Sequence, residues 1–115
     1  MEIIVNDEAI RVMQTLREQS KKEQIPVVVL YSEIHGGWGG LKKNIGVEIQ
    51  QSYEIKSHPE YTEYIKGKYP LPIYLDIQSE EKLPNKILLG TKLEYRGQVL
   101  TVVWNSHYPI TSDRC

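Results

Sequence analysis

One uninterrupted apolar segment constrains the fold of this chain more than any other feature. Residues 27–31 read Val-Val-Val-Leu-Tyr and follow directly after Pro26. A strand that is apolar at odd and even positions alike has both faces covered, which is typical of the centre of a sheet. Proline suits the first residue of such a strand, because that residue need not donate to the ladder. The segment therefore predicts a buried central strand.

Three further segments have the alternation or the β-branched composition of strands. Residues 45–49 alternate between apolar and small or polar side chains, which predicts a half-buried strand. A loop of about ten residues joins them to the central segment, so we expect the two strands to be antiparallel neighbours. Residues 2–5 predict an edge-like strand, and residues 73–77, which follow two prolines, predict another strand.

A hairpin is predicted in the last third of the chain. Residues 92–95 and 98–104 form its strands, and Arg96-Gly97 forms its turn, where glycine supplies the positive φ that tight hairpins require. Residues 86–89 form a separate short apolar segment before it, and residues 105–115 form a loosely held tail.

Two helices are expected, one long and one short. The side-chain oxygen of Asn6 can cap a helix that extends to Ser20. Its apolar residues have the i, i+3, i+4 spacing of one helical face: Ala9, Ile10, Val12, Met13 and Leu16. A capping box formed by Ser57 and Glu60 predicts a second helix of one or two turns that ends at Gly67.

A glycine-rich segment with a central tryptophan is the principal candidate for a binding site. It comprises His35, Gly36, Gly37, Trp38, Gly39 and Gly40, and Lys42 and Lys43 follow it closely. Successive backbone N–H groups can hold an anion, and the lysines would add positive charge. The spacing matches neither the G-x-x-x-x-G-K-[ST] nor the G-x-G-x-x-G phosphate-binding motif. The alternatives are a connecting loop whose Trp38 covers the core, or a loop whose Trp38 anchors a protein contact.

Composition and charge exclude several function classes. The 115 residues suit one domain, with 14 basic and 15 acidic side chains, so the bulk charge favours neither nucleic acid nor an anionic membrane. No apolar run is long enough to span a bilayer, and the first residues lack the pattern of a signal peptide. We expect a cytoplasmic protein.

Catalytic and metal-binding motifs are incomplete in this sequence. His35, His58 and His107 are far apart, and Cys115, the single cysteine, is only a remote candidate for a metal ligand. The spacings of structural zinc sites are absent, and no serine lies in a nucleophile elbow. The sequence therefore supports no enzyme class and predicts no cofactor.

Several segments together resemble the HesB-like family, which includes the A-type iron–sulfur carriers. They are residues 4–10 (Ile-Val-Asn-Asp-Glu-Ala-Ile), residues 72–77 (Pro-Ile-Tyr-Leu-Asp-Ile) and the closing strand pair over residues 92–104. The family's cluster ligands are three cysteines. Trp38 stands where the first would fall, and the C-terminal Cys-Gly-Cys is absent, with only Cys115 in that region. Thiolates are the normal ligands of such clusters, so the resemblance implies the fold without cluster carriage.

These patterns predict a single α+β domain over residues 1–115. We expect a mainly antiparallel, curled sheet or partial barrel of about five to seven strands, with the long helix on one face. The core should come from residues 27–31, 45–49, 73–77 and 99–103. The expected function is a non-catalytic HesB-like binding or accessory domain. The alternatives are a protein that binds a small anionic ligand through the glycine-rich segment, and a protein-interaction module or homodimer anchored by Trp38.

Overall fold

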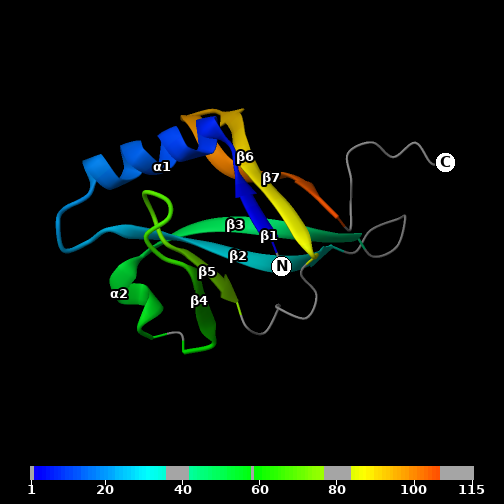
Figure 1. Cartoon of the computed structure of the whole chain (residues 1–115), viewed down its shortest axis with the longest axis horizontal. Helices are drawn as coiled ribbons and strands as arrows, with labels where there is room; N and C mark the ends of the chain where they lie inside the picture. Colours follow the sequence, from blue (N-terminus) through cyan, green and yellow to red (C-terminus); the bar gives the residue numbers. More distant parts are fainter. Residues whose placement is uncertain (1, 36–41, 58, 77–83, 107–115) are drawn as a thin grey trace.

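The computed structural model of the chain describes residues 2–35, 42–57, 59–76 and 84–106 (Figure 1). Within these residues the chain forms two helices and two β-sheets. In chain order the elements are β1 (Glu2–Val5), α1 (Asp7–Gln19), β2 (Pro26–His35), β3 (Lys42–Gln51), α2 (Ser52–Ile55), β4 (Tyr61–Ile65), β5 (Ile73–Asp76), β6 (Lys86–Glu94) and β7 (Gly97–Asn105).

The larger sheet has the strand order β3-β2-β5-β4, with β2 in its interior. β2 pairs antiparallel with β3 along its whole length and parallel with β5. Its residues Val28 and Leu30 are completely buried, and Val27 and Val29 are nearly so. The prediction of a central buried strand with an antiparallel neighbour over residues 45–49 is therefore confirmed.

The smaller sheet has the order β1-β6-β7, with β1 at an edge, parallel to β6. β6 and β7 form the predicted hairpin, and Gly97 in its turn has a φ of +116°. The two short segments expected before this turn are one continuous strand, because Gly90 does not interrupt β6. A Cβ atom at Gly90 would lie 2.8 Å from Nδ2 of Asn6, so glycine is needed there for close packing.

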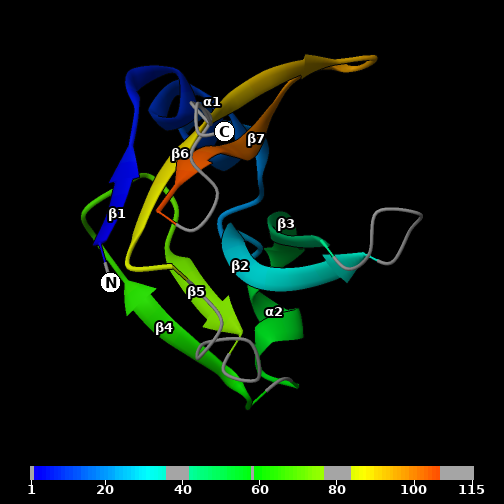
Figure 2. The same ribbon diagram turned by 90° about the vertical axis from the view of Figure 1, so that its right-hand side faces the viewer.

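The core lies between the sheets and beneath α1. Figure 2 shows α1 and the smaller sheet on one side of the molecule and the larger sheet on the other. Ala9 and Met13 of α1 are completely buried, and Asn6 caps the helix by accepting a hydrogen bond from the Ala9 N–H at 2.9 Å. The apolar face predicted for this helix is thus confirmed. Of the segments expected in the core, residues 45–49 are buried only in part: Ile45 is 5% exposed, whereas Ile49, further along the same edge strand β3, is 39% exposed.

The second predicted helix is wrong in position. Residues 61–65 form β4, which pairs antiparallel with β5 through a bulge between Glu63 and Ile65. The segment is rich in tyrosine, threonine and isoleucine, and pairing with the open edge of β5 outweighs the local capping signal. The short helix α2 lies earlier, where the backbone N–H of Gln51 donates to the Glu54 carboxylate at 3.0 Å.

The α+β class is confirmed, and the pairings β2–β3, β4–β5 and β6–β7 are antiparallel as expected. Each sheet also contains one parallel pairing, β1–β6 or β2–β5, so both sheets are mixed. The described residues form two separate sheets rather than one curled sheet, and these do not close into a barrel. Asn105, placed in the tail by the sequence, is the buried last residue of β7, and the Ser106 N–H donates to the Lys86 carbonyl at 3.0 Å. Residues 107–115 lie outside the described part of the chain.

Candidate functional site

The glycine-rich segment predicted as a site follows the end of a long strand pair. His35 is the last residue of β2 and Lys42 the first residue of β3, and they face each other across the two strands, with Lys43 next along β3. Residues 36–41, which include Trp38, lie outside the described residues. The structure confirms antiparallel strands on both sides of the segment, whereas the anion site and the Trp38 anchor stay predictions.

The described residues contain no cluster of three or more histidine, cysteine, aspartate or glutamate side chains that could hold a metal ion. His58, His107 and Cys115 lie outside the described residues. Burial raises the pKa of Tyr74, and the Glu63 carboxylate raises it further. The Tyr74 hydroxyl donates to Oε2 of Glu63 at 3.3 Å, so this phenol stays protonated and acts as a hydrogen-bond donor.

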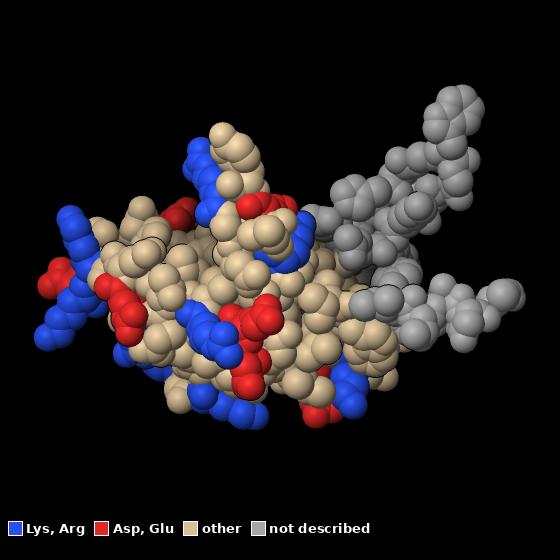
Figure 3. All heavy atoms as spheres, turned by 90° about the horizontal axis from the view of Figure 1, so that it is seen from above, with Lys and Arg blue, Asp and Glu red and all other residues tan. Residues whose placement is uncertain are grey.

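Charged side chains on the outer surface are mixed in sign. Figure 3 shows acidic and basic residues interspersed over one face of the molecule, without a broad region of a single sign. None of the helices in the described ranges is both long and apolar enough to cross a membrane. Because charge marks no single region on this face, exposed apolar side chains are the next candidates for a contact surface.

The β6–β7 hairpin projects from the body of the molecule (Figure 2). It carries two exposed apolar side chains. Leu93 is 77% exposed and Tyr95 is fully exposed. By the period-two rule Leu93 lies on the face of β6 that carries the buried Ile87 and Leu89, but here the strand has passed the edge of the core. Tyr95 follows in the turn. The sequence predicts the hairpin but not this exposure. Alternation of apolar and polar residues does not show where a strand extends beyond the elements that pack on it.

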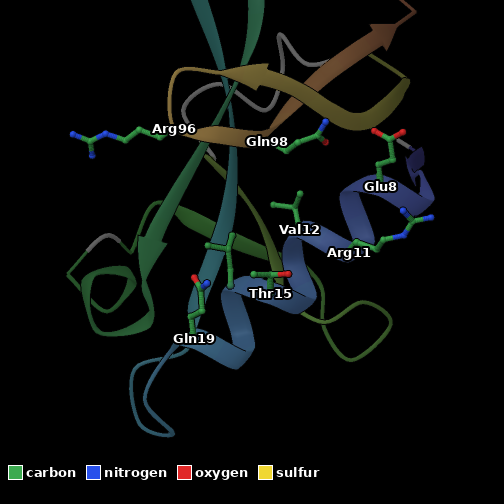
Figure 4. Close-up of a pocket in the computed structure, with 8 residues that line it drawn as sticks. Glu8, Arg11, Val12, Thr15, Gln19, Arg96 and Gln98 are labelled. Atoms are coloured by element: carbon green, nitrogen blue, oxygen red, sulfur yellow. The ribbon is translucent and has the colours of Figure 1, made fainter.

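A groove of about 650 Å³ lies between α1 and this hairpin. Figure 4 shows side chains of α1 on one side and hairpin residues on the other. Val12 and Leu16, which pack partly against the core, give the groove its apolar component, while charged residues Glu8, Arg11 and Arg96 contribute to its lining. Since Arg96 belongs to the turn of the hairpin, the groove and the exposed tip adjoin each other.

One exposed hydroxyl links the hairpin to the start of α1. The Thr91 hydroxyl lies 2.9 Å from Oε2 of Glu8 and 2.8 Å from Oε1 of Gln98. Because a hydroxyl carries one proton, it donates either to α1 or within the hairpin at a given time. Lys92 and Glu94 form an ion pair at 3.1 Å further toward the tip. The shape of the hairpin itself comes from the pairing of β6 with β7, which continues up to Glu94 and Gly97.

The arrangement as a whole is suited to contact with another surface. Tyrosine is among the residues that most often dominate binding energy at protein interfaces, and a projecting apolar pair beside a groove offers an anchor and an adjoining depression. Comparisons with protein-family models, with curated proteins and with solved structures found no match to this chain.

Proposed function

We propose that this chain is a non-catalytic binding domain that contacts protein surfaces through the tip of its β6–β7 hairpin. One observation carries the proposal: Leu93 and Tyr95 are 77% and fully exposed, on a hairpin that projects from the molecule. Scattered exposed apolar residues are ordinary on protein surfaces, but neighbouring ones on a projecting turn form a patch that favours burial.

Leu93 and Tyr95 would contribute binding free energy when a contact removes them from water. Moving an exposed leucine fully out of water stabilises a complex by about 1.5–3 kcal/mol, and tyrosine adds a large contact area at a small cost in side-chain freedom. Because β6 and β7 are already paired up to Glu94 and Gly97, little backbone order has to be gained on binding. A preformed apolar tip of this kind can therefore bind with a small loss of conformational entropy.

A second copy of the chain is the partner that this surface fits most directly. The tip lies beside the groove, so a two-fold axis that passes between the tip and the groove would bring each tip to the groove of the other copy in one self-complementary contact. Val12 and Leu16 would receive the apolar tip, and Arg96 of one copy would approach the groove that contains Glu8 of the other. This proposal moves the anchor of the expected homodimer from Trp38 to the hairpin.

Kinship with the HesB-like family remains part of the proposal. It is supported by the order of elements, in which β1, α1 and β2 precede β5 and the closing β6–β7 hairpin, as the resemblance implies. With one cysteine, Cys115, the chain lacks the thiolates for the family's cluster, and a cytoplasmic location accords with the lack of cysteine pairs. Anaerobic reconstitution with iron and sulfide tests this point: a chromophore that survives desalting and is lost in Cys115→Ser would contradict it.

Sedimentation velocity over a series of protein concentrations tests the proposed contact. We expect the wild type to self-associate and the double variant Leu93→Ser/Tyr95→Ser to remain monomeric at every concentration. At dilutions where the wild type is also monomeric, the two should have the same Tm, since both side chains are exposed in the monomer. Tyr53→Ser is the matched control, because Tyr53 is a 60% exposed tyrosine on α2. A wild type that stays monomeric, or a control that abolishes association equally, would contradict the proposal.

A further inference from the structure

A second cleft, of about 450 Å³, lies at the opposite end of β2 from the glycine-rich segment. It is bordered by the end of α1, the turn that leads into β2, and the chain between β4 and β5. Val27 at the start of β2 lines it, whereas His35 ends that strand. At about 3.3 Å per strand residue, these two positions are roughly 25 Å apart. The cleft is therefore a separate site from the one that the sequence predicted.

The floor of this cleft is apolar and aromatic. Val27, only 3% exposed, and Tyr74 lie on the same face of the larger sheet, because Tyr74 pairs with Val29, two residues along β2. Pro72 and Tyr69 from the β4–β5 connection complete this floor. Flat rings and aliphatic carbon of this kind favour an apolar ligand body.

The rim of the cleft is rich in cations. Arg17, Lys22 and Lys66 all line it, against the carboxylates of Glu23 and Glu63. Glu63 accepts the hydrogen bond of the Tyr74 hydroxyl and keeps its negative charge. The three cationic side chains still outnumber the two acidic ones, so the lining carries a net positive charge.

Arg17 is the best-positioned of these cations. It lies in the last turn of α1, and its Nη1 donates to the backbone carbonyl of Pro70 at 3.1 Å. That bond ties the guanidinium to the far wall of the cleft and uses one of its five N–H donors. The planar fork that remains matches the geometry of a carboxylate or a phosphate.

We infer that this cleft binds a small amphipathic anion, with an apolar body on the Val27–Tyr74 floor and a carboxylate or phosphate group at Arg17. The apolar floor would contact the body of the ligand, and the cationic rim would contact its anionic group. The floor removes apolar surface from water, and the cationic rim supplies charge-assisted hydrogen bonds. This inference is independent of the hairpin contact, since none of its residues belongs to β6 or β7.

Amide chemical-shift titrations of the whole protein test the inference with defined probes. Sodium benzoate and phenyl phosphate distinguish the two anionic groups, benzyl alcohol lacks the charge, and inorganic phosphate lacks the ring. We expect at least one of the two aromatic anions to shift amides around Val27, Lys66 and Tyr74, and to bind more tightly than either benzyl alcohol or inorganic phosphate. The anion that binds more tightly identifies the head group.

Matched variants locate the anion. Arg17→Gln should weaken binding by about tenfold or more, because it removes charge-assisted hydrogen bonds. Lys66→Gln provides a second test on a different segment and should also weaken binding. Lys56→Gln is the control and should leave binding unchanged, since Lys56 is an exposed lysine that does not line this cleft. An absence of shifts with both aromatic anions, equal binding of benzyl alcohol, or equal losses in the Lys66 and Lys56 variants would overturn the inference.

Discussion

Gly90→Ala tests how closely β6 packs against Asn6 at the start of α1. A Cβ atom at Gly90 would lie 2.8 Å from Nδ2 of Asn6 and 3.0 Å from Cγ1 of Val103. The Asn6 amide cannot turn away freely, because its Oδ1 accepts the Ala9 N–H as the helix cap. The added methyl group must therefore displace either the cap or a stiff β-branched side chain.

The expected cost follows from these contacts. Overpacking a core position typically costs about 1–3 kcal/mol, so Gly90→Ala should lower the free energy of unfolding by an amount in that range. Asn6→Ser alone should change it by no more than about 0.5 kcal/mol, because serine caps helices about as well as asparagine. It also removes the Nδ2 atom. In the Asn6→Ser background the alanine should therefore cost about 1 kcal/mol less than in the wild type.

Guanidinium chloride unfolding of the four proteins in this double-mutant cycle measures the coupling between Asn6 and Gly90. The midpoints should shift while the m values stay constant, since the change affects packing in the native state. A Gly90→Ala cost that is equal in both backgrounds, within about 0.3 kcal/mol, would refute the reasoning and with it the placement of β6 against the helix cap.

Two further predictions concern the core and the tyrosine of the second cleft. Met13→Ala should reduce the free energy of unfolding by about 2–5 kcal/mol, measured by denaturant unfolding, because Met13 is completely buried; a cost typical of a surface site would contradict this. Burial, and then Glu63, raise the folded-state pKa of Tyr74 above 10.0. The resulting contribution to stability is fully present below pH 10 and is lost as pH rises through the raised pKa. Tyr74→Phe should therefore lose less stability than wild type between neutral and strongly alkaline pH; identical pH profiles would contradict the shift.

The elements that the sequence predicted correctly are those whose signal is local. The 3.6-residue pattern from Ala9 to Leu16 and the cap at Asn6 place α1 without reference to the rest of the chain. The uniformly apolar residues 27–31 identify the centre of a sheet, and Gly97 marks the hairpin turn through its positive φ. Each of these features depends on neighbours within one turn or one strand.

The errors arose where distant segments decide the structure. The capping signal at residues 57–60 is local, but residues 61–65 pair with β5, and that pairing determines their conformation. Likewise, Gly90 looked like a break in the strand, whereas it is a close approach to Asn6 from the other end of the chain. Spacing within a segment carries no information about such contacts.

The candidate sites were missed for the same reason. The exposure of Leu93 and Tyr95 depends on where β6 leaves the core, and the second cleft brings Arg17 of α1 beside Pro70 and Lys66, which are remote in sequence. The signal available in the sequence was the pair of apolar residues next to a tight turn, a position where charged or polar side chains are usual. The glycine-rich segment, whose residues 36–41 lie outside the described part of the chain, stays a prediction.

Intermolecular nuclear Overhauser effects test the central claim, the contact through the hairpin tip, most directly. A sample that mixes copies with ¹³C-labelled leucine methyl groups and unlabelled copies reports only contacts between molecules. The account predicts Overhauser effects from the Leu93 methyl groups to protons of Val12 and Leu16 in the unlabelled copy. If Leu93 shows no intermolecular effect at concentrations where the protein is dimeric, or if the protein is never dimeric, the proposed contact is wrong.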